Sequence, residues 1–304
     1  MIDTWHDESG ELIDNALSLI SNYGSNAYVR KAVQTFFGLP PAVAGKGVGA
    51  KPKNPGMFKE LQKQFNTISD FFGGHPPDWM KIKPSLYCDS TWAVKEAQGV
   101  QATVRDYTGK EIWEGGAPVT VKQAFGKDLR SGLVPFWCSD INAYDFASSK
   151  NGEQYCTNNK ETKGATSSLN VPYKENLHIA VVTLCPYAFT SMDAIASLPF
   201  PSSVAKEDLK DHNGNNLKTG TSLEVVLPKS ATLLHEAFHV LNEGVFATTK
   251  EVYSVAECLN LKSLDARKNP ESYVLFMLAM WYMEKYGWDF IPGAMAFAEL
   301  RRLE

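Results

Sequence analysis

The sequence predicts an α+β fold, mostly helical with a small sheet, in a single domain of 304 residues. Three observations predict it. Apolar residues recur at helical spacing in both terminal parts of the chain. The middle part instead carries alternating or continuous apolar stretches that are typical of strands. The HExxH pattern falls within one of the C-terminal helical stretches. We therefore expect an N-terminal helical part (1–75), a part of sheet and loops (85–227) and a second helical part (228–304).

Composition narrows the class of protein. Hydrophobic residues make up 44% of the chain and charged residues 21%, as in an ordinary globular protein. The formal net charge of -4 argues against a nucleic-acid binder, which normally carries a basic face. No apolar run reaches the ~20 residues that span a bilayer, and the longest, 273–283, is predicted to form a buried helix. We expect no nucleic-acid or membrane partner, and a monomer.

The cysteines leave the compartment open. None of them forms a CxxC pair, which argues against a structural zinc knuckle. Two disulfides with one free thiol would fit a secreted protein, whereas five buried thiols would fit a cytosolic one. No signal peptide is visible at Met1, so the protein is either cytosolic or begins after a removed leader. The five are Cys88, Cys138, Cys156, Cys185 and Cys258.

The N-terminal part is predicted to contain three helices. Apolar residues between 12 and 20 follow helical spacing. The same pattern over 27–37 ends at Gly38-Leu39-Pro40-Pro41, a strong helix stop. A loop rich in Gly, Lys and Pro at 45–55 then precedes a third amphipathic helix at 57–72.

The middle part is predicted to contain strands joined by polar loops. Residues 99–107 alternate between apolar and polar, and 110–113 follow a turn, which predicts a β-hairpin. The apolar run 178–185 predicts a buried strand, and 222–227 a short one. Polar composition predicts that 139–173 is mostly surface loop and that 207–221 forms another polar loop.

The C-terminal part is predicted to be helical. A helix begins near residue 230 and ends near Gly244. Asn269-Pro270 separates two further helices, at 250–264 and 271–285. A last short helix is expected over 293–303.

His235-Glu236-Ala237-Phe238-His239 carries the chemistry. Residues four apart differ by about 40° around a helix, so His235 and His239 project from one face and can bind one tetrahedral ion. Glu236 lies about 100° round, where it can reach a metal-bound water without being a ligand. The metal lowers the pKa of that water toward ~7, and the glutamate takes its proton as general base. The pattern predicts one Zn²⁺ per chain.

The third zinc ligand stays open among three glutamates. The longer pattern HExxHxxGxxH is absent, because Val245 stands where its last histidine would be. Glu243 drifts about 80° from His235 around the helix, which is poor for a shared ion. Glu251 follows in a loop, and Glu257 lies at the distance found in zincins that take a glutamate from a following helix.

At this point the sequence resembles a known family. Residues 232–239 (TLLHEAFH), Val252-Tyr253 and 269–276 (NPESYVLF) resemble the aspzincins, the deuterolysin and peptidyl-lysine metalloendopeptidase group of secreted, mostly fungal peptidases. The strand region 179–189 (IAVVTLCPYAF) adds to the likeness. The resemblance implies a zincin-like metalloprotease fold, a secreted zinc peptidase and a peptide or protein substrate.

The chain departs from the family at the ligand loop. The family's third ligand is an aspartate three residues before the loop tyrosine, where this chain has Lys250. The adjacent Glu251, with its longer stem, is the predicted ligand in its place. If Tyr253 matches the family's tyrosine, its hydroxyl supports the oxyanion of the reaction. Glu271 falls where the family has an acid near the specificity pocket, and Val274 replaces a second acid of the lysine-specific members.

The leading function hypothesis is a secreted zinc endopeptidase with His235, His239 and Glu251 as metal ligands and Glu236 and Tyr253 as catalytic residues. Residues 222–227 would then form an edge strand that pairs with an extended substrate. One alternative is a zinc enzyme on the same scaffold with a non-peptide substrate. Another is a non-catalytic zinc-binding protein, although such a protein has no need of Glu236.

Overall fold

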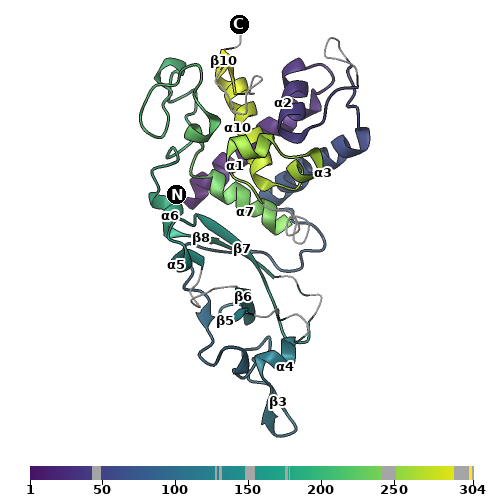
Figure 1. The fold of residues 1–304 in the computed structure, drawn as a ribbon, viewed down its shortest axis with the longest axis vertical. Coiled ribbons are helices and arrows are strands. Elements are labelled where there is room, and N and C mark those ends of the chain that lie inside the picture. Colours follow the sequence, from purple (N-terminus) through teal and green to yellow (C-terminus); the bar gives the residue numbers. More distant parts are fainter. Residues whose placement is uncertain are drawn as a thin grey trace. The chain divides into compact units, whose positions relative to one another are not determined.

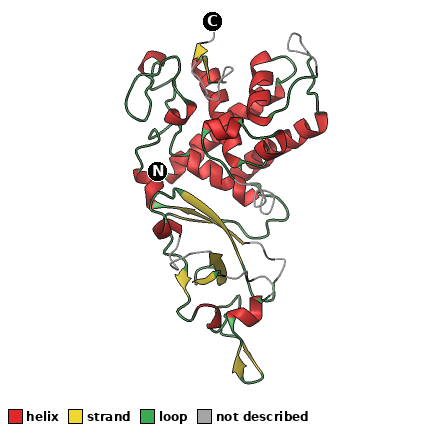
Figure 2. Ribbon diagram, in the orientation of Figure 1, coloured by secondary structure: helices red, strands yellow, loops and turns green. Residues whose placement is uncertain are grey.

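The computed structural model consists of helices and small sheets (Figure 2). Helix makes up 42% of it, which confirms the α+β class. The chain forms two compact units, unit 1 (Met1–Pro77 and Ser191–Glu304) and unit 2 (Asp78–Thr190). The organisation as a single domain stays a prediction. The structure describes residues 1–42, 49–126, 129, 132–147, 155–174, 177, 179–241, 251–290 and 301–302.

Unit 1 is the helical unit (Figure 1). Its longer helices are α1 (Ile2–Ser21), α2 (Ala27–Phe37), α3 (Pro55–Phe72), α7 (Ala231–Leu241) and α10 (Pro270–Tyr286). Its short elements are α8 (Val255–Leu259), α9 (Ser263–Ala266), the 3-10 turns η2 (Lys206–Asp208) and η3 (Leu223–Val226), and the paired strands β9 (Trp288–Asp289) and β10 (Arg301–Arg302).

Helix α10 forms the centre of unit 1. It contacts α1, α2, α7 and α8. Residues 270–282 are all buried, because apolar side chains surround the helix instead of occupying one face. This confirms the buried helix predicted here. The rings of Phe37, Phe65 and Phe238 lie 4.9, 5.3 and 4.7 Å from the ring of Tyr273. Since Phe238 belongs to α7, this aromatic cluster packs α7 against α10.

Helix α2 shows why local signals place a helix well. The side chain of Asn26 accepts hydrogen bonds from the backbone N–H groups of Tyr28 and Val29, which caps the first turn. Gly38 ends the helix in the left-handed conformation with φ 61°. A Cβ at Gly38 would also lie 3.1 Å from the Cβ of Ser263. The predicted helix at 27–37 and its stop are confirmed.

Unit 2 contains two three-stranded sheets. In the first, β8 (Ile179–Leu184) lies between β1 (Ser85–Tyr87), which is parallel to it, and β7 (Gly164–Leu169), which is antiparallel. All six residues of β8 are buried, which confirms the predicted buried strand. The second sheet joins β2 (Val94–Lys95), β5 (Val134–Cys138) and β6 (Ala143–Ala147). The remaining elements are the ribbon β3 (Trp113–Glu114) and β4 (Ala117–Pro118), η1 (Gly99–Gln101), α4 (Val121–Phe125), α5 (Tyr155–Asn158) and α6 (Pro186–Thr190).

The cysteines follow neither of the two predicted schemes. One disulfide joins Cys156 in α5 to Cys185 at the end of β8. Cys88 is an exposed thiol, and Cys138 and Cys258 are buried thiols. Unit 2 is therefore cross-linked once.

Three predictions, two in unit 2 and one at η3, are corrected in whole or in part. The polar stretch 139–173 contains β6 and β7, because backbone groups form the ladder of β7 against β8, while Thr166 and Ser168 stay half-buried and Ser167 is buried. The predicted hairpin is confirmed in part: Arg105 and Glu111 form an antiparallel bridge across the turn at 106–110, whereas 99–101 form the 3-10 turn η1 instead of a strand. Residues 222–227 contain η3 and its two cap residues instead of a strand. The Ser222 side chain caps the turn, and Leu223 and Val226, three apart, are both buried.

Two C-terminal predictions also change. The helix expected at 250–264 is replaced by two short helices, α8 and α9. The first begins only at Val255, because the Ser254 side chain accepts a hydrogen bond from the N–H of Glu257 and caps the helix there. Most of the helix expected at 293–303 lies outside the described residues. Its described part, 301–302, is strand β10.

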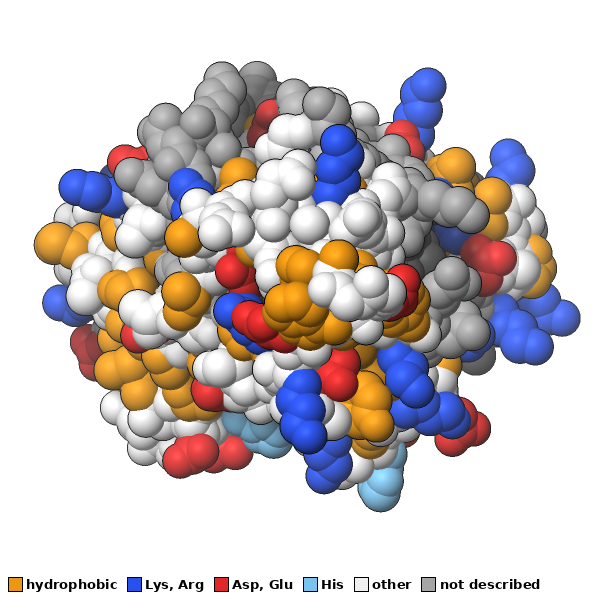
Figure 3. Space-filling model, turned by 90° about the horizontal axis from the view of Figure 1, so that it is seen from below, with side chains coloured by type: hydrophobic (Ala, Val, Ile, Leu, Met, Phe, Trp, Pro, Cys, Tyr) orange, Lys and Arg blue, Asp and Glu red, His pale blue; other side chains and the backbone are white. Residues whose placement is uncertain are grey.

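The surface is chemically mixed. On the face in Figure 3, hydrophobic side chains form small groups among acidic and basic ones. Within the described ranges, no helix combines the length and apolar character needed to cross a membrane.

Candidate metal centre

Helix α7 presents the HExxH side chains on one stripe. Thr232, His235, Glu236 and His239 fall within a sector of about 100° around the helix axis. Thr232 and His239 are the only residues of α7 that are half-buried, and all its others are buried. The stripe is therefore the side of α7 that approaches solvent, while Phe238, about 60° round from His235, packs against Tyr273 of the aromatic cluster.

The loop before α8 brings a carboxylate to the two histidines. Oε1 of Glu251 lies 3.0 Å from Nε2 of His235 and 3.1 Å from Nε2 of His239. The three residues form a group that could hold a metal ion, with ligand atoms within 4.8 Å of one another. Around a tetrahedral zinc with bonds of 2.0–2.2 Å, ligand atoms lie about 3.3–3.6 Å apart. The two oxygen–nitrogen distances are therefore within a few tenths of an ångström of this spacing.

A second carboxylate lies behind His235. Oε2 of Glu271, in the first turn of α10, is 2.9 Å from Nδ1 of His235. Glu271 thereby holds the ring by the nitrogen that faces away from Glu251. In metal sites, such a carboxylate fixes the histidine tautomer and raises the basicity of the ligating nitrogen. The resemblance implied a place near a specificity pocket for Glu271, and in the structure its carboxylate contacts Nδ1 of His235.

The histidines and glutamates of the group shift one another's pKa values. Burial disfavours the charged imidazolium of His235, but hydrogen bonds to Glu251 and Glu271 outweigh it and raise the pKa to about 10. Burial would raise the pKa of Glu251, yet its bonds to His235 and His239 hold that pKa far below the usual range. Glu236 adds its charge to the field at His235. Three carboxylates around two imidazoles make an environment that favours a divalent cation.

Tyr253 contacts two members of the group, His235 and Glu251. Its ring stacks on His235 at a centroid distance of 5.6 Å and an interplanar angle of 20°. Its hydroxyl donates to Oε2 of Glu251 at 2.9 Å. Burial and the negative charge of Glu251 raise the pKa of Tyr253 well above its usual value, so the phenol is a hydrogen-bond donor at neutral pH. Tyr253 is 60% exposed.

The other candidate ligands lie elsewhere. Glu257 is exposed, and its Oε2 accepts from the hydroxyl of Ser254, the residue that starts α8. Glu243 and Lys250 lie outside the described residues, as does Val245. Val274, which replaces an acid of the lysine-specific aspzincins, is fully buried in α10.

Sequence reasoning missed the role of Glu271 because 36 positions separate it from His235. The only local signal was an acidic residue directly after Asn269-Pro270, at the start of a helix that is otherwise buried. A carboxylate in such a place needs a partner, since burying a charge without one is costly.

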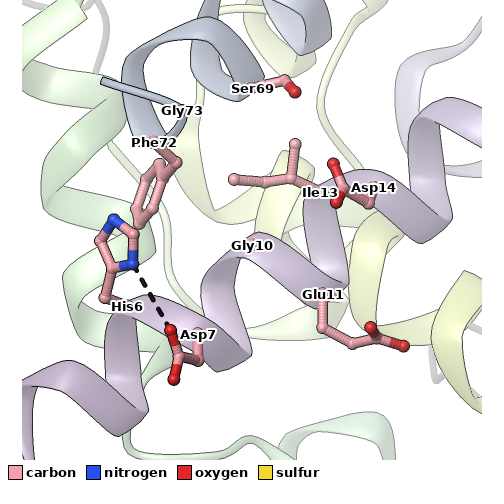
Figure 4. Close-up of a pocket in the computed structure, with 9 residues that line it drawn as sticks. All are labelled: His6, Asp7, Gly10, Glu11, Ile13, Asp14, Ser69, Phe72 and Gly73. Carbon is pink, nitrogen blue, oxygen red and sulfur yellow. Dashed lines mark ion pairs between the residues drawn. The ribbon is translucent and has the colours of Figure 1, made fainter.

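A cleft of about 390 Å³ lies away from these residues, on α1 and the end of α3 (Figure 4). It contains the ion pair between Nδ1 of His6 and Oδ1 of Asp7, at 3.8 Å. Both side chains are more than half exposed, so the pair contributes little to stability. None of the predicted site residues lines this cleft.

The chain shows no significant match to a protein-family model, to a curated protein or to a solved structure. The geometry of the site itself therefore carries the functional argument.

Proposed function

We propose that the protein is a zinc-dependent endopeptidase. One observation carries the proposal: the Nε2 atoms of His235 and His239 converge on the same carboxylate oxygen of Glu251. Glu236 lies between the two histidines in sequence and on the same stripe of α7. Two imidazoles, one carboxylate and a neighbouring glutamate that is not a ligand are the parts of a catalytic zinc site.

The donor set fits zinc in chemistry as well as in spacing. Imidazole nitrogen and carboxylate oxygen are both common zinc ligands, and three protein ligands leave a fourth position open. Glu271 holds Nδ1 of His235 and so leaves Nε2 to face the ion. The bound ion supplies Lewis-acid chemistry, in which it lowers the pKa of a water ligand and polarises a carbonyl.

The side chains of this chain then have separate roles in peptide hydrolysis. The carboxylate of Glu236 accepts the proton of the attacking water and passes it to the leaving amine. The hydroxyl of Tyr253 turns from Glu251 toward the carbonyl oxygen and donates a hydrogen bond as negative charge develops there. Glu251 and the two histidines hold the ion throughout.

The same proposal covers fold and compartment. We propose a zincin-like fold related to the aspzincins, with Glu251, two residues before Tyr253, replacing their aspartate. The disulfide Cys156–Cys185 supports a secreted protein, because disulfides persist in oxidising compartments.

The proposal is tested by digesting a broad peptide library with the purified chain and identifying the products by mass spectrometry. We expect cleavage that a chelator abolishes and added Zn²⁺ restores. The variant Glu236→Gln should keep its zinc and lose most of the activity, on the order of 10²–10⁴-fold, because an amide cannot take the proton of water.

Two results would contradict the proposal. If elemental analysis finds no zinc in the wild-type chain, the proposed metal centre is wrong. If the chain binds one zinc ion and cleaves no peptide of the library, the metal centre is supported and the endopeptidase function is wrong.

A further inference from the structure

The ligand loop 251–254 has no regular secondary structure, although it must place Glu251 within a few tenths of an ångström. A loop of this kind needs support from side chains around it, because a metal ligand on an unsupported loop is held loosely. The described contacts of the loop backbone show where that support comes from.

Asn269 holds the residue next to Glu251 by both of its backbone groups. Its Oδ1 accepts from the N–H of Val252 at 3.1 Å, and its Nδ2 donates to the C=O of Val252 at 3.1 Å. Since one backbone group is a donor and the other an acceptor, the orientation of the amide is fixed. The amide also donates toward Ser272 Oγ and Cys258 Sγ, at 3.2 and 3.3 Å, and the residue is 3% exposed.

The comparison with Asn26 shows that this arrangement is specific. Both asparagines are N-cap residues with extended backbone, at α2 and α10. Asn26 accepts from the first N–H groups of its own helix, as an N-cap normally does. Asn269 makes no cap hydrogen bond to α10 and uses both ends of its amide on Val252. The helix start is left to Pro270, whose fixed φ suits the first helical position.

We propose that Asn269 is a positioning residue of the metal centre, one that clamps Val252 and thereby holds Glu251 against His235 and His239. With Glu271 two residues later, the start of α10 supports both halves of the site, the loop ligand and the helix ligand. The other end of the loop is tied by Glu224, whose Oε1 accepts from the N–H of Val255. The inference rests on the proposed zinc site and does not depend on the substrate.

The test replaces Asn269 by serine. Serine is a good N-cap, so Asn269→Ser keeps the start of α10, but its side chain is too short to bind both groups of Val252. Zinc affinity is measured by competition with a chromogenic chelator, and the visible absorption spectrum is recorded with Co²⁺ in place of zinc. The matched control is Asn26→Ala, which removes two hydrogen bonds at a helix start in the same unit.

We expect Asn269→Ser to weaken zinc binding about 10–100-fold, as is typical when a group that orients a ligand is lost. Its Co²⁺ spectrum should change in the same direction as that of Glu251→Ala, because the same ligand is displaced. Asn26→Ala should lower the melting temperature and leave affinity and spectrum unchanged.

The inference is overturned if Asn269→Ser matches the wild type in affinity and in spectrum while Glu251→Ala does not. Equal losses in Asn269→Ser and Asn26→Ala would also overturn it, since they would reflect general destabilisation. If the wild type itself binds no zinc, the proposed zinc site is wrong. That result differs from a wild type that binds zinc and an Asn269→Ser variant that binds it equally well, which contradicts only the role of Asn269.

Discussion

Glu251→Ala is the change that tests the site most directly. It removes the only carboxylate in the described metal group and leaves both histidines in place. The site would keep two neutral imidazole ligands and lose the one negatively charged ligand. The change should also free the hydroxyl of Tyr253, which donates to Oε2 of Glu251.

The magnitude follows from the geometry. Losing a group that only orients a ligand typically costs 10–100-fold in metal affinity, so losing the ligand should cost more than 100-fold. That corresponds to more than about 2.8 kcal/mol, since each tenfold change is about 1.4 kcal/mol. Glu251→Asp should lose almost as much. Its carboxylate is withdrawn by one C–C bond, about 1.5 Å, from nitrogens that lie 3.0 and 3.1 Å from Glu251 Oε1.

The assay is chelator competition at neutral pH with elemental analysis of the loaded protein. Glu257→Ala is the matched control, because Glu257 is a glutamate of the same region whose carboxylate bonds Ser254 and not the histidines. We expect wild-type affinity for the control. Wild-type affinity in Glu251→Ala, together with loss of zinc in Glu257→Ala, would refute the reasoning and move the third ligand to α8.

Three further changes have defined outcomes. Tyr253→Phe should keep zinc affinity and lower kcat on the order of 10²-fold, as when one donor to an oxyanion is removed, measured on a peptide cleaved by the wild type. Glu271→Gln should weaken zinc about tenfold in the competition assay, because the amide still accepts from Nδ1 of His235 but without charge. Replacing Cys156 and Cys185 by serine should lower the free energy of unfolding in denaturant by about 3.6 kcal/mol, from the entropy of a 29-residue loop.

Each of these has a control elsewhere on the surface. Tyr107→Phe, Glu284→Gln and Cys88→Ser change exposed residues and should have no effect on kcat, zinc affinity and unfolding, respectively. An unchanged kcat in Tyr253→Phe would show that the Tyr253 hydroxyl has no role in catalysis. Unchanged affinity in Glu271→Gln would mean that its charge does not act on the ion. An unchanged unfolding free energy would show that the cross-link does not stabilise unit 2.

Sequence reasoning worked where the signal was local. Helix α2 was predicted because apolar residues follow helical spacing over 27–37 and the stop at Gly38 lies directly at its end. The strand β8 was predicted from the apolar run 178–185, and all six residues of the strand are indeed buried. It failed at β7 and η3, since the polarity of β7 hides a backbone ladder to a strand ten residues on, and Leu223 and Val226 fit a strand or a turn equally well until their burial is known.

The candidate site divides in the same way. The sequence by itself determined that His235, Glu236 and His239 share a face, because the rise and rotation of a helix fix that relation within four residues. Glu251 came from a resemblance, and only the folded chain places its oxygen between two nitrogens. Glu271 and Asn269 could be assigned only in the structure, where α10 packs against α7 through Phe238 and Tyr273. Contacts over 17 or 36 positions depend on how helices pack, and no local periodicity encodes that packing.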